Sequence, residues 1–164
     1  MPLLPKRIVS PVLLALILVL SAASLGYAWW LFQIERGNQA SRAGDFDTAA
    51  GIYQGAEAPF RRLPWLAHIL RDDYQRLAFS QTRLLYARGQ NEEVMDKLEE
   101  EARRAPFLAD SSEYSFWLGN VLLRRAIQSK DPEEKLKALH AALEEYGRGL
   151  ASRPDDWDLK YNYE

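Results

Sequence analysis

The stretch SRAGDFDTAAGIY, residues 41–53, contains the turn that decides the fold. We expect the preceding helix to end at Gly44, and Asp45 can accept hydrogen bonds from the free N–H groups at the start of the next helix. Ala49 and Tyr53 then follow at the four-residue spacing of one helical face. The stretch therefore predicts two helices joined by a tight turn, as in one half of a repeat unit.

An uncharged, apolar segment precedes this turn. Residues 8–32 form a run of 25 residues without a charged side chain, which is long enough to cross a hydrocarbon core of ~30 Å at ~1.5 Å per residue with some tilt. We expect a retained transmembrane helix that continues unbroken toward the turn. The alternative is a cleaved signal peptide, because residues 21–23 and 26–28 are small enough for a peptidase site. The segment is, however, longer than the usual ~7–15 residue signal core.

The residues at the two ends of this segment predict its orientation. The positive-inside rule places residues 1–7 in the cytoplasm, because two basic residues precede the segment, and tryptophans at its other end suit the outer interface. The predicted membrane-interface residues are Lys6, Arg7, Trp29 and Trp30. We therefore expect a protein of the bacterial inner membrane, with residues 33–164 in the periplasm.

Composition excludes several classes of site. The chain has no cysteine, which excludes a lipoprotein anchor, a disulfide framework and thiolate metal sites. It has 21 basic and 23 acidic residues. Without Lys6 and Arg7, 19 basic residues remain, so the part after the anchor carries a charge of about −4 with both signs interleaved. No basic block is present to displace phosphate counterions, and we expect no nucleic-acid ligand.

Glycine and proline divide residues 33–164 into helices, and no stretch alternates apolar and polar residues as a strand does. The sequence therefore predicts an all-α domain. Pro59 and Pro64 are expected to close the short helix after the first turn. Pro64 also suits the first turn of a long helix that stops at Gly89.

Further helix boundaries follow from local signals. A helix from about Asn91 should end before Pro106, and DSSE at residues 110–113 predicts a capping box at the start of the next helix. KDPEE at residues 130–134 predicts another, with Asp131 as the cap, proline in the first turn and the second glutamate as the returning carboxylate.

The end of the chain predicts one more short helix. The last long helix should end before Pro154, and DDW at residues 155–157 begins a helix of less than three turns. We expect either an unusually short closing helix or a chain that continues beyond Glu164.

The first turn recurs in weakened form. AGDFDTAAGIYQGA (43–56), RGQNEEVMDKLEEEARRAP (88–106) and ALEEYGRGLASRP (142–154) each place a small or aliphatic residue four positions before an aromatic residue or leucine. Two of them end in proline, and Trp117-Leu118-Gly119 precedes the third. These features resemble the tetratricopeptide repeat, a helix-turn-helix of ~34 residues.

The resemblance predicts a stack of antiparallel helical hairpins, an α-solenoid, with the membrane helix as the leading arm of the first hairpin. Gly44 and Gly89 are 45 residues apart, about 11 more than the ~34 residues of a strict period. The alternative is a generic helical bundle in which the aromatic residues are ordinary core.

The whole arrangement is similar to MxaK-like membrane proteins, which are small single-span proteins with tetratricopeptide-like helices. The features that carry this likeness are the anchor, the turn RAGDFDTAA (42–50) and the tail 142–164 with its proline-acid turn. The resemblance implies an accessory role in assembling or maturing a periplasmic or membrane-associated metalloenzyme, beside MoxR ATPases and von Willebrand factor A proteins. It carries over no catalytic residues.

The residues give little support to catalysis. His68 and Asp72 are four positions apart and could hold half of a metal site, but a solvated polar face explains them as well. Acidic residues also gather in pairs at 72–73 and 155–156 and in the run 99–101, and two of these three sets lie at expected helix ends or on an expected exposed face. We therefore expect a non-enzyme without cofactor, metal or small-molecule substrate.

A partner-binding groove is the more specific prediction. In a tetratricopeptide stack the first helix of each hairpin lines the concave surface. The predicted groove residues are Asn38, Arg42, Phe79, Arg83, Tyr86, Phe116, Asn120 and Arg124. Arginine binds carboxylates and asparagine can satisfy a peptide backbone, so we expect an extended or helical segment that carries acidic residues. Ordinary core and scattered surface charge are the alternative interpretation.

The sequence thus predicts a membrane-anchored scaffold for protein interaction that acts with assembly factors. One alternative is a holdase-like factor, similar to the single-span tetratricopeptide subunit that accompanies the bacterial Sec translocon. A second alternative is a metal-dependent hydrolase that uses His68.

Overall fold

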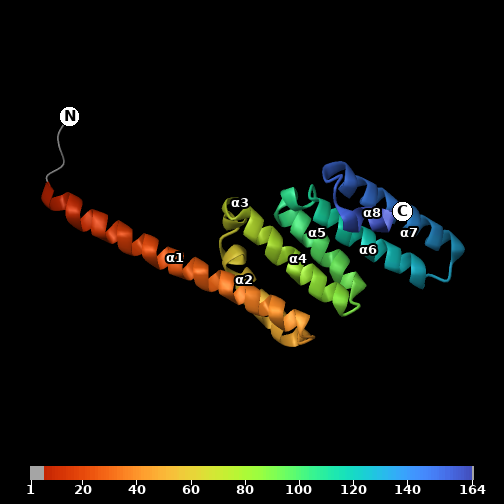
Figure 1. Ribbon diagram of the computed structural model, residues 1–164, viewed down its shortest axis with the longest axis horizontal. Helices are drawn as coiled ribbons and strands as arrows, with labels where there is room; N and C mark the ends of the chain where they lie inside the picture. Colours follow the sequence, from red (N-terminus) through yellow and green to blue (C-terminus); the bar gives the residue numbers. More distant parts are fainter. Residues whose placement is uncertain (1–5, 164) are drawn as a thin grey trace.

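The computed structural model describes residues 6–163, with side chains from residue 11 onward. Within that range every regular element is helical, which confirms the all-α prediction (Figure 1). The elements are α1 (Lys6–Arg42), α2 (Phe46–Arg62), α3 (Leu66–Ile69), α4 (Arg71–Ala87), α5 (Asn91–Arg104), the 3-10 helix η1 (Pro106–Leu108), α6 (Ser112–Gln128), α7 (Pro132–Ser152) and α8 (Trp157–Tyr163).

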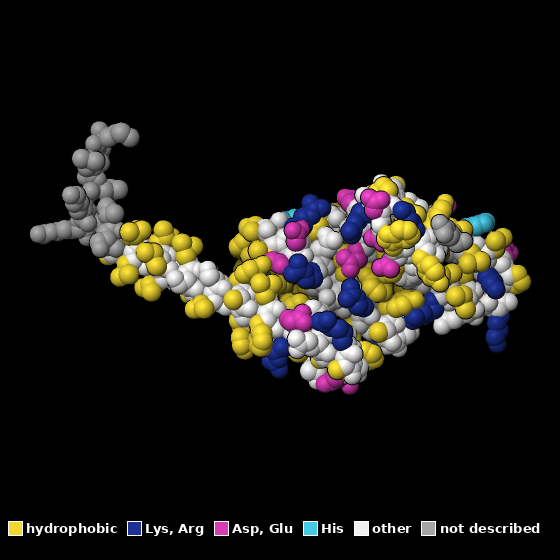
Figure 2. Space-filling view, in the orientation of Figure 1, with side chains coloured by type: hydrophobic (Ala, Val, Ile, Leu, Met, Phe, Trp, Pro, Cys, Tyr) yellow, Lys and Arg dark blue, Asp and Glu magenta, His cyan; other side chains and the backbone are white. Residues whose placement is uncertain are grey.

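Helix α1 has two halves in different surroundings. Its N-terminal half projects away from the other helices (Figure 1), and the part of it from residue 11 onward carries apolar side chains (Figure 2). Within Pro11–Arg42 an 18-residue stretch has a mean hydropathy of 2.2 and none of it is buried. This helix is long and apolar enough to cross a membrane, and a signal sequence near the N-terminus would have the same properties.

The C-terminal half of α1 belongs to the helical domain. It packs against α2, and Ile34 and Gly37 are buried there. The helix therefore passes without a break from the apolar segment into the first helical hairpin. This confirms the expectation that the apolar helix is the leading arm of that hairpin.

The remaining helices form two more antiparallel pairs, α4 with α5 and α6 with α7 (Figure 1). Helix α2 also packs against α4, and α5 against α6, so consecutive pairs lie side by side. Helix α8 packs on α7, where the fully buried Leu159 lies against Gly149. The core runs along the row of helices, because each pair covers the apolar face of the one before it.

Two of the turns depend on glycine. Gly44 and Gly89 have φ angles of +80° and +75°, a left-handed conformation that other residues adopt only with strain. After Gly44, the Asp45 carboxylate accepts a hydrogen bond from the Thr48 N–H at 3.2 Å and caps α2. The turn predicted at residues 41–53 is confirmed.

Two predicted helix bounds differ from the structure. Helix α2 runs through Pro59 and ends at Arg62, before Pro64, the second proline expected to close it. Pro59 has no N–H group, so the Gly55 carbonyl four residues earlier lacks its usual donor within the helix. Gly55 is exposed, so water can bind this carbonyl instead. The long helix expected after Pro64 is split, because Leu70 has φ −101° and ψ 50° and separates the one-turn α3 from α4.

The two predicted capping boxes differ from the structure in detail. Ser111, not Asp110, caps α6, and its hydroxyl accepts from the Tyr114 N–H at 3.2 Å. Asp131 caps α7 as predicted, accepting from the Glu133 N–H at 3.0 Å. Glu134 does not return to that cap. It accepts from Arg125 at 2.8 Å and from the Ser129 hydroxyl at 3.0 Å, which ties α7 back to α6.

The first and third hairpins share one packing device, in which a Gly-Asn pair on the first helix faces a tyrosine on the second. A Cβ atom on Gly37 would lie 2.6 Å from the Tyr53 ring, and one on Gly119 would lie 2.5 Å from the Tyr146 ring. Both tyrosines are buried. Only glycine permits helices to approach this closely over an aromatic ring.

The asparagine beside each glycine binds the same tyrosine. The Tyr53 hydroxyl donates to Asn38 Oδ1 at 2.7 Å, and the Tyr146 hydroxyl donates to Asn120 Oδ1 at 2.8 Å. Each asparagine oxygen also lies 3.4 Å from a donor on the next helix in the row, Ser80 of α4 or Asn162 of α8. The middle hairpin lacks the pair and packs through Val94 and Leu98 instead.

Replacement of Gly119 by alanine should lower the free energy of unfolding by about 1–3 kcal/mol, because the added methyl group overlaps the Tyr146 ring. Gly51→Ala is the matched control. Gly51 lies inside α2 with open space around its Cβ position, so alanine there should stabilise the helix by about 0.5–1 kcal/mol. Urea unfolding of both variants measures the difference, and equal effects would contradict the close-approach account.

Candidate partner-binding surface

The eight residues predicted to line a groove lie on α1, α4 and α6, the first helices of the three hairpins. These helices adjoin one another in chain order. The structure therefore places the residues on neighbouring helices, as the repeat alignment predicts. It does not leave all of them available to a partner.

Three of the eight side chains are used inside the fold. Phe79 is 2% exposed and belongs to the core, so its assignment to the groove is wrong. Asn38 and Asn120 are half-buried and accept hydrogen bonds from the tyrosines of their own hairpins. Their side-chain oxygens hold hairpins together, so these oxygens are not free to accept hydrogen bonds from a peptide backbone.

Arg124 is likewise committed to an internal contact. Its guanidinium carbon lies 3.6 Å from the centre of the Tyr86 ring, and its Nη1 donates to the Tyr86 carbonyl at 3.0 Å and to Asn91 Oδ1 at 3.3 Å. A cation over an aromatic face with two hydrogen bonds forms a specific clamp. Arg124 thus joins α6 to the turn between α4 and α5, and Tyr86 also packs against Trp117 at 5.5 Å between ring centres.

Arg42, Arg83 and Phe116 are the predicted residues that stay most open. Arg42 pairs with Glu35 on the surface at 2.9 Å. The Arg83 side chain is 63% exposed and lies 3.9 Å from Glu113. Phe116 is half-buried and meets Trp117 edge-on at 5.1 Å between ring centres.

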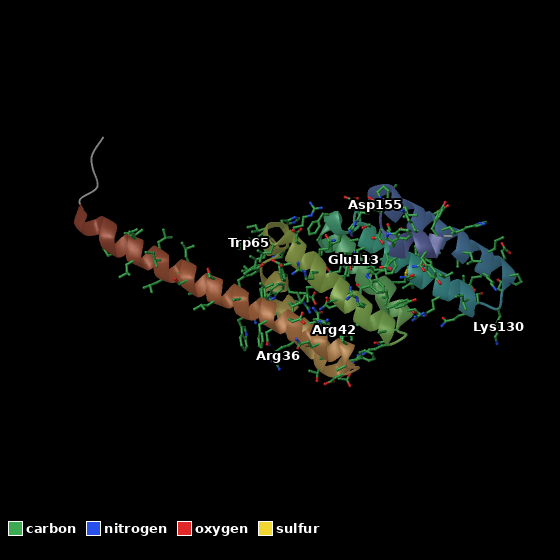
Figure 3. All side chains as sticks on the ribbon, in the orientation of Figure 1. Arg36, Arg42, Trp65, Glu113, Lys130 and Asp155 are labelled. Atoms are coloured by element: carbon green, nitrogen blue, oxygen red, sulfur yellow. The ribbon has the colours of Figure 1, made fainter. Side chains whose placement is uncertain are left out.

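A cavity of about 250 Å³ adjoins Arg83 between α4, α6 and the start of α8. We call it the α4–α6–α8 pocket, and its lining residues are Arg83, Glu113, Phe116, Trp117, Arg153, Asp156 and Asp158. Figure 3 shows Glu113 near the middle of the helical domain. The lining contains two arginines and three carboxylates around two aromatic rings.

The electrostatics of this pocket are mixed. Burial raises the pKa of the Glu113 carboxyl, while the charge of Arg83 and the indole N–H of Trp117 oppose the rise. Arg153 lies 3.9 Å from Asp156. A purely acidic segment in this pocket would bring further negative charge beside three carboxylates.

A buried group of charges between α2, α4 and α5 was not predicted. This ion cluster consists of Glu57, Tyr74, Gln81, Lys97, Glu101 and Arg104. Lys97 Nζ lies 2.6 Å from Glu101 and 3.5 Å from Glu57, and Arg104 lies 2.7 Å from Glu57 and 3.7 Å from Glu101. The two carboxylate side chains are only 3% and 10% exposed, so their charges depend on these cations.

Neutral donors complete the ion cluster. The Tyr74 hydroxyl donates to the Glu101 carboxylate, and Gln81 Nε2 donates to Glu57 at 3.1 Å. Burial raises the pKa of the Tyr74 phenol well above its usual range, and the neighbouring Glu101 carboxylate raises it further. Burial alone would also raise the pKa of the Glu57 carboxyl, but Lys97, Arg104 and Gln81 outweigh it and hold that pKa below its usual value.

Spacing along α5 was the sequence signal for this cluster. Val94, Leu98 and Glu101 follow one another at four and three residues, so they share one helical face, and all three are buried. In the acidic run 99–101, Glu99 and Glu100 are exposed, whereas Glu101 is buried.

His68 and Asp72, considered above as half of a metal site, lie on different helices. His68 is on α3 and Asp72 on α4, and the break at Leu70 separates them, so they do not share one continuous helix. The His68 ring lies 6.0 Å from that of Phe107. Among the residues that the structure describes, no group of three or more His, Cys, Asp or Glu residues is arranged to hold a metal ion.

The two tryptophans predicted to lie at the membrane interface have different surroundings. Trp29 is 60% exposed. Trp30 instead packs against α2, where its indole N–H donates to the Ala56 carbonyl at 2.9 Å and its ring meets that of Phe60. The side chains of Lys6 and Arg7 lie outside the described residues. The helical domain therefore begins to contact α1 before residue 33, the boundary predicted from the sequence.

Comparison with known proteins gives no match to a protein-family model, a curated protein or a solved structure.

Replacement of Glu101 by glutamine should lower the free energy of unfolding by about 3–5 kcal/mol, because it removes one of the two buried carboxylates that Lys97 and Arg104 share. Glu99→Gln is the control on the same helix. Glu99 is 61% exposed and pairs with Arg103 at the surface, so its loss should cost less than about 1 kcal/mol. Similar losses of stability in the two variants would contradict a structural role for the ion cluster.

The lowered pKa of Glu57 predicts an acid dependence of stability. Its stabilisation is complete above the pKa of a carboxyl in the unfolded chain, about 4.3, and is lost as pH falls through the lower pKa of the folded state. Glu57→Gln should remove this part of the acid-induced loss, although it is less stable at neutral pH. Urea unfolding over a pH series tests this, and an unchanged slope below pH ~5 would show that Glu57 contributes nothing to it.

Proposed function

We propose that this chain is a membrane-anchored scaffold for protein interaction. The observation that carries the proposal is the continuity of α1, whose exposed apolar half passes without a break into a half that packs within the first hairpin. A helix shared in this way holds the domain at a fixed angle to the membrane. A flexible linker would leave it free to swing.

The helical hairpins are proposed to form a tetratricopeptide-like stack. Support comes from three antiparallel pairs in chain order and from the Gly-Asn-Tyr device that recurs in the first and third pairs. Such stacks present extended surfaces to other proteins. Asn162 of α8 contacts Asn120 in the same way that Ser80 of α4 contacts Asn38. We therefore assign α8 to the position that the first helix of a fourth hairpin would occupy.

The resemblance to MxaK-like proteins gives this scaffold a proposed setting. The anchor would cross the bacterial inner membrane with the N-terminus inside, and the helical domain would lie in the periplasm. There it would act as an accessory factor in maturing a metalloenzyme, with MoxR and von Willebrand A-type proteins as partners.

The α4–α6–α8 pocket is the proposed partner site. Arg83 and Arg153 offer bidentate donors, while Asp156 and Asp158 offer acceptors, around the rings of Phe116 and Trp117. Such a surface recognises a defined segment of mixed charge. A holdase for unfolded chains would instead expose an apolar groove, and most of the aromatic residues predicted for the groove are covered, Tyr86 by Arg124 and Phe79 by the core.

A photo-crosslinking amino acid in place of Arg83 tests the partner site in living cells. We expect one discrete adduct, because the side chain is 63% exposed beside the pocket. The same amino acid at Glu99, which is exposed on α5 but does not line the pocket, is expected to give none. A broad smear of exported proteins from position 83 would favour the holdase alternative, and no adduct at all would contradict the proposed site.

A further inference from the structure

Three large apolar side chains are exposed on the connection between α2 and α4. Leu63, Trp65 and Ile69 are 45%, 54% and 69% exposed. Leu63 and Trp65 precede the one-turn α3 and Ile69 is its last residue, and we call these three side chains the α3 edge. Adjacent exposed apolar side chains of this size indicate a contact surface, because leaving them in water is unfavourable by about 25 cal/mol per Å².

The α3 edge lies beside α1 at the end of its apolar half. The Tyr27 hydroxyl donates to Asp73 Oδ2 at 2.6 Å, and Asp73 is in the first turn of α4, four residues after Ile69. Figure 1 shows α3 at the margin of the domain nearest the projecting half of α1, and Figure 3 shows Trp65 at that margin.

The length of α1 places the Tyr27–Asp73 contact at the surface of a bilayer. From residue 8 to Tyr27 the helix rises about 30 Å at ~1.5 Å per residue, which matches a hydrocarbon core of ~30 Å. The Asp73 carboxylate cannot enter hydrocarbon without a large cost, and Arg76 lies 3.9 Å from it. Tyr27 and Asp73 therefore belong at the headgroup level, and the α3 edge lies at the same level.

Basic residues flank the α3 edge. Arg61 and Arg62 end α2, and Arg71 begins α4, and all three are exposed. Arginine binds lipid phosphate groups, while tryptophan is favoured at the boundary between headgroups and acyl chains. Apolar side chains between arginines form the pattern of a segment that lies in the membrane interface.

We infer that the α3 edge is a second membrane contact, which inserts Leu63, Trp65 and Ile69 into the outer boundary of the bilayer that α1 crosses. The inference rests on the anchoring that is part of the proposed function. Two contacts, α1 and the α3 edge, fix both the tilt and the rotation of the domain. The α6–α7 turn, marked by Lys130 at the far end of the domain in Figure 3, is then directed away from the membrane.

Single-cysteine labelling tests the contact directly, because the chain has no cysteine of its own. The variants Ile69→Cys, Lys130→Cys and Leu18→Cys each carry an environment-sensitive fluorophore, and the full-length protein is reconstituted in vesicles of phosphatidylcholine and phosphatidylglycerol. All three positions are exposed in the structure, so labelling leaves the core intact. A nitroxide-labelled lipid serves as the quencher.

We expect the labels at positions 18 and 69 to lose most of their emission to the quencher and the label at position 130 to keep it. Quenching at 18 without quenching at 69 would overturn the α3 contact and leave the anchor standing. No quenching at 18 would refute the anchor and, with it, this inference. Equal quenching at 69 and 130 would show unspecific adsorption of the domain and would also overturn the contact.

A second variant distinguishes insertion of the α3 edge into the bilayer from a position merely close to its surface. Trp65→Asp in the Ile69→Cys background adds a charge to the α3 edge without touching the core, since Trp65 is exposed. The label at 69 should then move toward water, with weaker quenching and a red-shifted emission. Unchanged quenching and emission would contradict insertion of the α3 edge.

Discussion

The rest of the structure depends on one shared helix. In lipid, every backbone N–H and C=O must be paired within the segment, so an apolar span is obliged to be helical. In α1 the same hydrogen-bonded helix continues past the apolar residues to Arg42, where Gly44 permits the chain to reverse. Trp30, Ile34 and Asn38 then dock on α2, and the domain is built on the end of the apolar helix.

Buried polar groups determine how the other helices pack against α1 and against one another. Asn38 and Asn120 each hold a tyrosine of their own hairpin and reach a donor on the next helix, so one side chain fixes both contacts. The ion cluster does the same for α2, α4 and α5. Buried ion pairs of this kind are poor sources of net stability, but a wrong register would leave a carboxylate such as Glu101 unpaired. We interpret the cluster as a device that selects one docking arrangement.

Local signals in the sequence predicted the features that depend on a few neighbouring residues. The turn at Gly44, the cap at Asp131 and the helix stop before Pro106 each follow from backbone chemistry within a short window. Helix periodicity likewise predicted the all-α class. These features could be found because no distant contact overrides them.

Other features needed the three-dimensional arrangement. Leu70 breaks the helix after Pro64 although the residues there are compatible with a continuous one. Arg124 was predicted to bind a partner, but the Tyr86 ring lies directly beneath it in the fold. Glu101 lies in a run of acids that suggests a solvated surface, and only its spacing from Leu98 places it inside. For Arg124, and for Glu101 through Tyr74, contacts between segments distant in the sequence accompany the observed placement.

On the proposed function, α1 holds the helical domain at a fixed angle. Electron-spin distance measurement between labels at Ser24→Cys on the projecting half of α1 and Lys130→Cys at the far end of the domain, with the protein in lipid nanodiscs, tests it most directly. Both positions are exposed. The account predicts a single narrow distance distribution. A broad distribution, as a domain swinging on a flexible joint would give, would contradict it.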